Sequence, residues 1–261
     1  MLRDKPTTVS LIITTYNRPD ALELVIKSLD LQNYSVDQVI VADDGSMLET
    51  TEIINHWRDR LPITHVRQGD DGFRAARIRN LALLKASGEY VVMIDGDCLM
   101  PPTFISNHLS LAKENTMVSG SRYLYSKDFT ASLLKTPEAQ MFNVFQNAKF
   151  KTLPLGSLRD WHRKSWKIVR TCNLGLWRKD AVAVGGFDER YIGWGREDSD
   201  FVIRLLSSGI RIRSGRYSVC VGHLFHPEQS RGYLAENCRF LDEVINRQTD
   251  NYLAEQSVIE L

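Results

Sequence analysis

The chain predicts an α/β protein built on a doubly wound, mainly parallel sheet. Its first hundred residues alternate short apolar runs with amphipathic segments of helical period. Three of the apolar runs end in hydroxyl or acidic side chains. Right-handed crossovers bring the carboxyl ends of such strands to one edge of the sheet, where ligands bind in this class of fold. With 261 residues, the chain is also long enough to bury a substantial core.

The first half predicts seven elements in order. The β-branched run "VSLIITTY" predicts a buried strand, and the next helix has Pro19 at its start with Leu22, Val25 and Leu29 on one face. Gly88 closes the third helix. The expected elements are strand 9–16, helix 18–32, strand 37–46, helix 48–60, strand 63–68, helix 74–87 and strand 89–98.

The second half is less regular. A helix is expected at 101–115, and a second follows the glycine-punctuated loop at 185–196, with Phe201, Val202 and Leu205 facing inward. The segment 210–228 alternates like strands, and 235–256 has the pattern of an amphipathic helix that either packs on the core or mediates dimerisation. No linker is evident, so we expect one compact unit over residues 1–261.

Composition narrows the function classes. A net charge of +1 argues against a nucleic-acid partner, because such domains usually carry a strong basic excess. Four cysteines without a C-x-x-C pair predict a reduced, cytoplasmic protein. The apolar run near the N-terminus is too short for a signal peptide, and no run reaches the roughly 20 residues of a membrane helix. We therefore expect a soluble protein, at most peripheral at a membrane.

Acidic side chains follow two of the expected strands. Asp95 and Asp97 are two apart, so both carboxylates can face one cleft, where Mg²⁺ or Mn²⁺ would relieve their repulsion and bridge a diphosphate. The alternative is a turn in which the aspartates cap backbone amides. Asp44 could likewise be a turn residue or accept the imide N–H of a uracil ring. Glycine-rich phosphate loops are absent, so side chains such as Arg74 would have to neutralise any phosphate.

The stretch "GWGREDSD", at 193–200, places three carboxylates beside a tryptophan. One interpretation is a helix start, with Glu197, Asp198 and Asp200 near free amides and the positive end of the helix dipole. The other is a catalytic carboxylate next to an aromatic platform for a sugar. The residues alone leave both open.

Four segments together carry a resemblance. They are "VSLIITTYNRPDALELVIKSL", "VIVADDGS", "GFRAARIRNLALLKASGEYVVMIDGDCLMPP" and "VGGFDERYIGWGREDSDFVIRLLSSG". In this order they resemble family 2 glycosyltransferases with a GT-A fold, over roughly residues 7–230. The last segment is similar to the W-G-x-E-D-x-D region of β-1,4-galactosyltransferases and bacterial polysaccharide polymerases.

The resemblance implies a donor site with a metal ion. Asp97 would be the metal ligand of the D-x-D motif, and Asp95 would face the ribose or share the metal. A histidine after the following strands would complete the metal site, and both His223 and His226 are candidates. The residues that would hold the nucleotide are Thr14, Tyr16, Arg18, Asp44 and Arg74, together with Asp95.

The resemblance also implies how the sugar is transferred. Asp198 would be the catalytic base, Glu197 would orient a sugar, and Trp194 would stack on it, with Gly195 and Tyr191 adjoining. Asp200 would be a helix-start residue. A basic, tryptophan-containing segment at 151–178 would contact the acceptor, an anionic lipid or a phosphorylated oligosaccharide, or would be a mixed surface loop.

The expected protein is an inverting, Mn²⁺- or Mg²⁺-dependent glycosyltransferase. It would move a hexose or N-acetylhexosamine from a UDP-sugar to a glycan or glycolipid acceptor, in the synthesis of bacterial surface polysaccharide or lipopolysaccharide. If the protein is attached to a membrane, it would lie at the inner face. Its nucleotide-sugar half would be 7–100, its acceptor half 101–230, and its helical end 231–261. The rivals are a sugar nucleotidyltransferase, disfavoured by "TTYNRP" after the first strand, and a non-catalytic UDP-sugar-binding relative.

Overall fold

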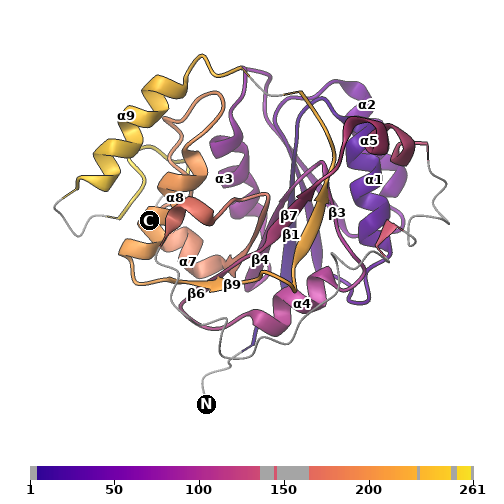
Figure 1. Cartoon of the computed structure of the whole chain (residues 1–261), viewed down its shortest axis with the longest axis horizontal. Helices are drawn as coiled ribbons and strands as arrows, with labels where there is room; N and C mark the ends of the chain where they lie inside the picture. The colour runs from indigo at the N-terminus through magenta and orange to yellow at the C-terminus, as the bar shows by residue number, and fades with distance from the viewer. Residues whose placement is uncertain (1–4, 136–143, 146–164, 228–229, 248–251, 260–261) are drawn as a thin grey trace.

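A seven-stranded sheet forms the centre of the computed structural model, which describes residues 5–135, 144–145, 165–227, 230–247 and 252–259 (Figure 1). Pairing is parallel from β3 through β2 and β1 to β4, and the antiparallel β8 then joins β4 to β6 and β9. In sheet order the strands are β3 (Ile63–Arg67), β2 (Gln38–Asp43), β1 (Val9–Thr15), β4 (Tyr90–Asp95), β8 (Asn173–Trp177), β6 (Thr116–Ser119) and β9 (Arg211–Ser214). The predicted doubly wound, mainly parallel sheet is confirmed.

A second sheet of three short strands stands beside the first. Its central strand, β10 (Cys220–His223), pairs antiparallel with β5 (Cys98–Leu99) and parallel with β7 (Ser121–Leu124). β5 directly follows the D-G-D turn that begins at the end of β4. Its pairing with β10 therefore brings a strand from the second half of the chain next to Asp95 and Asp97.

Helices cover both faces of the large sheet (Figure 1). One face packs against α1, α2 and α4, and the opposite face packs against α3, α7 and α8. The described helices are α1 (Pro19–Asp30), α2 (Leu48–Trp57), α3 (Ala75–Lys85), α4 (Phe104–Leu111), α5 (Lys127–Leu133), the short 3₁₀ helix η4 (Trp166–Ile168), α7 (Arg178–Ala183), α8 (Glu197–Ser207) and α9 (Leu234–Ile245).

The first strand shows why its sequence is continuously apolar. Leu11 and Ile13 lie in the core on the α1 side, whereas Ile12 lies in the core on the α3 side, and all three are fully buried. Successive side chains of a strand point to opposite faces, so a strand covered on both sides needs apolar residues at every position.

Three parts of the second half differ from expectation. The strand-like segment at 210–228 forms two strands, β9 and β10, but they belong to different sheets. The terminal helix α9 ends at Ile245, and residues 252–259 have no regular structure. The run "NLGLW" forms β8, which the sequence did not distinguish from a general core segment because a five-residue apolar run has no readable period.

None of the helices in the described ranges is both long and apolar enough to cross a bilayer. All four cysteines are free thiols.

Candidate active site

A cleft of about 960 Å³ opens at the carboxyl ends of β1, β2 and β4. The chain leaves β1 toward β2 on one side and returns to β4 on the other, so this edge is the switch point where doubly wound sheets bind ligands. The small sheet and the loop before α8 supply the opposite wall. Both sequence halves therefore line one cavity of ligand size.

One corner of the cleft gathers a carboxylate and two imidazoles. The Oδ1 atom of Asp97 lies 3.7 Å from Nε2 of His223, and its Oδ2 atom lies 3.4 Å from Nε2 of His226. The two imidazole rings are 5.2 Å apart. The structure thus brings both candidate histidines to the same aspartate.

These residues fit a divalent cation. The Nδ1 atom of His223 lies 2.9 Å from the carbonyl of Leu224, and that of His226 lies 2.7 Å from the carbonyl of Pro227. A carbonyl oxygen only accepts, so Nδ1 carries the hydrogen in each ring and the Nε2 lone pair is left to bind a metal. A carboxylate and two such lone pairs form an oxygen and nitrogen ligand set for a divalent ion. Cys98 reaches the same cluster but is fully buried beneath it.

A second corner of the cleft holds the acids that begin α8. Burial and the neighbouring Glu197 carboxylate raise the pKa of Asp198 to about 6, although Arg170 and Arg79 oppose the shift. The Asp198 carboxylate accepts a long hydrogen bond of 3.4 Å from the Ser199 hydroxyl and forms no ion pair with a described residue. It is therefore available as a base near neutral pH.

Arg79 links the last residue of β4, Asp95, to the first residue of α8, Glu197. Its guanidinium donates to Oε1 of Glu197 at 3.0 Å and to Oδ1 of Asp95 at 3.2 Å, and it is 5% exposed. A single buried cation thereby holds the acid after β4 and the acid at the start of α8, which are far apart in sequence.

Sequence reasoning missed Arg79. In "RAARIRNLALLKAS" it looked like one more basic residue on an amphipathic helix. The available signal was its position on the face of α3 that also carries the buried Ala76 and Leu83, where an arginine requires a carboxylate partner.

Four of the nucleotide candidates line the cleft: Thr14, Tyr16, Arg18 and Asp44. The hydroxyl oxygen of Thr14 is buried without a hydrogen-bond partner among the described residues, which leaves it for a ligand. Asp44 accepts from the side chain of Gln68 and from the backbone N–H of Arg74.

A fifth nucleotide candidate also lines the cleft, whereas the side chain of the sixth does not. Asp95 lines the cleft, held by Arg79. The Arg74 side chain does not line it, because its guanidinium pairs with Asp71 at 2.7 Å. The backbone N–H of Arg74 does contact another nucleotide candidate, because it donates a hydrogen bond to Asp44.

Three residues of the loop that precedes α8 have a left-handed backbone conformation. Gly193, Gly195 and the non-glycine Arg196 have φ values of +70°, +103° and +83°. Trp194 and Gly195 line the cleft, and the Trp194 ring is 42% exposed with Arg231 over it. Tyr191 does not line the cleft, since it is 2% exposed and packs edge-on against Phe240. The strained backbone of Arg196 presents the tryptophan and the first acids of α8 to the same cavity.

Asp200 lies on the other side of α8. It is fully buried, and its Oδ2 atom accepts from Nε and Nη2 of Arg204 at 2.8 and 2.6 Å. It stands in the first turn of the helix, as expected, but it pairs with this arginine one turn later and not with a free amide.

Part of the basic segment lies outside the described residues. This applies to residues 151–164, which include Trp161. Trp166 opens the 3₁₀ helix η4, and Trp177 is buried at the end of β8 with its indole N–H bonded to the carbonyl of Lys113. Trp177 is therefore a core residue.

Two family models match the chain. The first, described as glycosyl transferase family 2, covers residues 10–165, and the second, described as the N-terminal domain of galactosyltransferase, covers residues 157–229. The fold and the enzyme class they define are those of a glycosyltransferase, which decides against both rival expectations. Because the first model spans more than half of the chain, the protein belongs to glycosyl transferase family 2.

Curated relatives agree with this membership. Chondroitin synthase of Escherichia coli is 29% identical over 79% of this chain, and hyaluronan synthase of Pasteurella multocida is 29% identical over 77%. The aligned region spans only 33% and 23% of the lengths of these two proteins.

Solved structures show the same GT-A fold. S. aureus TarS 1-349 in complex with UDP-GlcNAc superposes with a TM-score of 0.68 at 17% identity, over 93% of this chain and 68% of that one. A mannosyltransferase from Pyrobaculum calidifontis in complex with GDP-Man and Mn²⁺ superposes with a TM-score of 0.57 at 22% identity, over 89% and 60%.

Proposed function

We propose that the chain transfers a hexose or N-acetylhexosamine from a UDP-sugar to a hydroxyl of a glycan acceptor, with inversion at the anomeric carbon. The observation that carries this proposal is the shared cleft, in which Asp97 with two histidines occupies one corner and Asp198 occupies another. Relatives named as glycan synthases and a neighbour bound to UDP-GlcNAc support the substrate class.

The donor would lie along the strand ends. Thr14 and Asp44 would meet the nucleotide, and Asp97, His223 and His226 would hold Mn²⁺ or Mg²⁺, with Mn²⁺ favoured because two ligands are imidazoles. When bound, the ion supplies a positive charge that stabilises the departing diphosphate.

The acceptor would lie against α8. Asp198 would take the proton of the attacking hydroxyl, while Glu197, held by Arg79, would orient a sugar and Trp194 would stack on its face. One base on the side away from the leaving group, with no nucleophile forming a covalent intermediate, leads to inversion. We further propose that the chain acts in the synthesis of a surface polysaccharide or lipopolysaccharide, as one unit in the cytoplasm or peripheral at the membrane.

Calorimetric titration of UDP with and without Mn²⁺ tests the donor half. We expect micromolar binding that requires the metal, and slow hydrolysis of a panel of UDP-sugars would then identify the preferred sugar. Absence of UDP binding under both conditions would contradict the proposal.

A further inference from the structure

A second, smaller cavity of about 370 Å³ adjoins the cleft. Its wall comes from the β6–β7 junction, the stretch from η4 to β8, and the end of β9. Arg122, Arg170 and Cys172 line both cavities, so the two hollows share a wall. The size is within the range of pockets that take a small molecule.

The lining of this cavity carries charge of one sign. Four of its residues are cationic and none is acidic: Arg122, Lys167, Arg170 and Arg216. All four are exposed to solvent, which screens their mutual repulsion, and an anion that enters the hollow would meet charge of one sign.

The contacts of three of these cations are weak or neutral. Arg122 meets the sulfur of Cys172 at 3.8 Å, Arg170 donates to the carbonyls of Lys167 and Val169, and the Lys167 ammonium lies 5.5 Å from the Trp166 ring. None of the three forms an ion pair with a carboxylate in the described part of the chain. Their charge therefore remains available to a ligand.

The wall that this cavity shares with the cleft lies between the two corners, because Cys172 contacts Cys98 of the metal corner and the charge of Arg170 acts on Asp198. Arg170 lines both hollows and is close enough to Asp198 for its charge to act on that carboxylate. A molecule that presents a hydroxyl to Asp198 therefore has this cluster within its reach, whereas the diphosphate of the donor would belong at the corner of Asp97, His223 and His226.

We propose that the small cavity binds a phosphate group of the acceptor, so that the acceptor is a phosphorylated glycan or a lipid-linked sugar phosphate. Several guanidinium and ammonium groups around one hollow suit a phosphate, which arginine binds through paired hydrogen bonds. This inference rests on the proposed function, since it supplies the acceptor class for the same cleft.

The test titrates four small molecules into protein saturated with UDP and Mn²⁺, so that the donor site is filled. Glucose 1-phosphate represents a terminal phosphate, dimethyl phosphate an internal diester, glucuronate a carboxylate, and methyl glucoside a neutral sugar. The loss variant is Arg122→Gln/Lys167→Gln. Its matched control is Lys85→Gln/Arg211→Gln, which removes the same two residue types from exposed positions outside the cavity.

We expect at least one phosphate to bind at least tenfold more tightly than methyl glucoside. The loss variant should weaken that binding at least tenfold, the control variant should not, and added salt should weaken it in the wild type. Tighter binding of glucose 1-phosphate would point to a sugar phosphate end group, and binding of dimethyl phosphate to a phosphodiester chain.

Three outcomes would overturn the proposal: no phosphate binding above that of methyl glucoside, equal phosphate binding by the loss variant, or binding of glucuronate alone. UDP binding is measured first, with metal, on every variant. Its failure in the wild type counts against the proposed function, and the phosphates are then titrated into UDP-free protein, where the comparison of the loss and control variants still decides the inference.

Discussion

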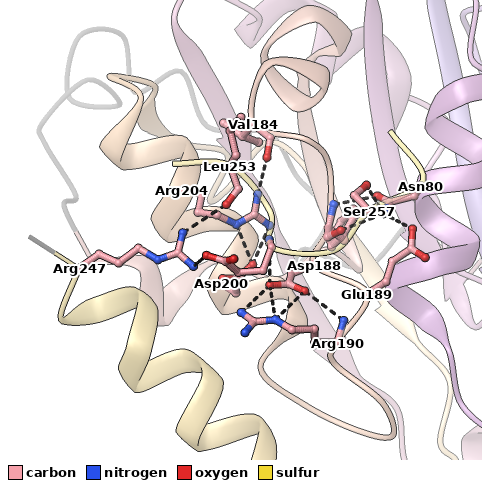
Figure 2. A network of polar contacts seen from close by, with 12 residues as sticks. Asn80, Val184, Asp188, Glu189, Arg190, Asp200, Arg204, Arg247, Leu253 and Ser257 are labelled. Atoms are coloured by element: carbon pink, nitrogen blue, oxygen red, sulfur yellow. Dashed lines mark hydrogen bonds and ion pairs between the residues drawn. The ribbon is translucent and has the colours of Figure 1, made fainter. Parts of the chain in front are cut away.

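Two clusters of acids and arginines lie on opposite sides of α8. On the side away from the cleft, Asp188 and Asp200 are buried, and each is paired with an arginine (Figure 2). On the cleft side, Asp198 has no such pair among the described residues, and burial beside Glu197 raises its pKa to about 6. Burial raises the pKa of both Asp198 and Asp200, but of these two carboxylates it is Asp200 that has an arginine paired with it.

The paired cluster holds the loop before the site in place. Arg204 donates to Asp200 and to the carbonyl of Val184, and Arg190 donates through its side chain and backbone to Asp188 (Figure 2). Nearby, Glu189 accepts from Asn80 on α3 and from the backbone N–H of Val258 in the last described segment (Figure 2). Paired charges and hydrogen bonds thus tie the glycine-rich loop to α3, α8 and the C-terminal segment.

The comparison indicates a division of roles. A buried carboxylate that is paired with an arginine stabilises geometry, whereas one that is desolvated without such a partner is reactive and costs stability. Arg79 combines the two roles. It is a buried, paired charge that stabilises geometry, and the acids it pairs with, Asp95 and Glu197, line the cleft.

Arg79→Gln should have the largest combined effect on stability and transfer, since it removes the cation that holds both Asp95 and Glu197. Leaving Asp95 and Glu197 without it should lower the free energy of unfolding by about 3 kcal/mol and transfer by at least about 100-fold. Chemical denaturation and initial rates measure the two losses. Arg77→Gln, on the same helix with its side chain 49% exposed, should change stability by less than about 1 kcal/mol. Equal effects of the two substitutions would show that Arg79 is an ordinary surface cation.

Asp198→Asn should separate activity from stability. Transfer should fall by about 10²- to 10⁴-fold, while metal-dependent UDP binding stays unchanged, because the substitution removes the base but not the donor site. The wild-type carboxylate has a raised folded pKa, so its penalty exists above about pH 4 and disappears as the pH falls from 6 to 4. The variant should therefore be more stable at pH 7, by no more than about 3 kcal/mol, and equal to wild type near pH 4.

The control for that variant is Asp59→Asn, at an exposed position. It should alter neither transfer nor the pH dependence of stability. Wild-type transfer rates in Asp198→Asn would exclude Asp198 as the base.

Arg204→Met should lower stability and leave activity nearly unchanged. It leaves Asp200 buried without its partner and the Val184 carbonyl without its donor, so unfolding free energy should fall by about 3–5 kcal/mol. Activity per folded molecule should change less than about threefold, because neither residue lines the cleft. Asp200→Asn/Arg204→Met removes the stranded charge and should recover part of the stability. A loss of transfer in fully folded Arg204→Met would contradict the division of roles.

The smallest expected effect is the pH dependence of the wild type. A base must be ionised, so transfer should be half-maximal near pH 6 and fall about tenfold for each unit below it. Metal-dependent UDP binding measured over the same range separates this step from a loss of donor binding. A profile that stays flat from pH 7 to pH 5 at constant UDP binding would contradict the assignment.

Much of the fold could be predicted from local pattern. The strands that become β1, β2 and β4 are apolar runs ending in polar residues, and α1 and α8 have one apolar face with clear ends. Their bounds differ from expectation by only a few residues, because burial on a fixed period is encoded locally. The short strands β5, β7 and β8 could not be found in this way, since two to five residues show no period.

The sequence by itself determined which residue types stand at the strand ends and in "GWGREDSD", and therefore the family and the set of candidate site residues. Only the tertiary structure decided which of them meet. It placed both histidines at Asp97, turned the Arg74 side chain and Tyr191 away from the cleft, and joined Asp95 to Glu197 through Arg79. It also gave Asp198 and Asp200 opposite surroundings. The physical reason is that a side chain's partners come from segments distant in sequence, and these partners set its charge state and its role.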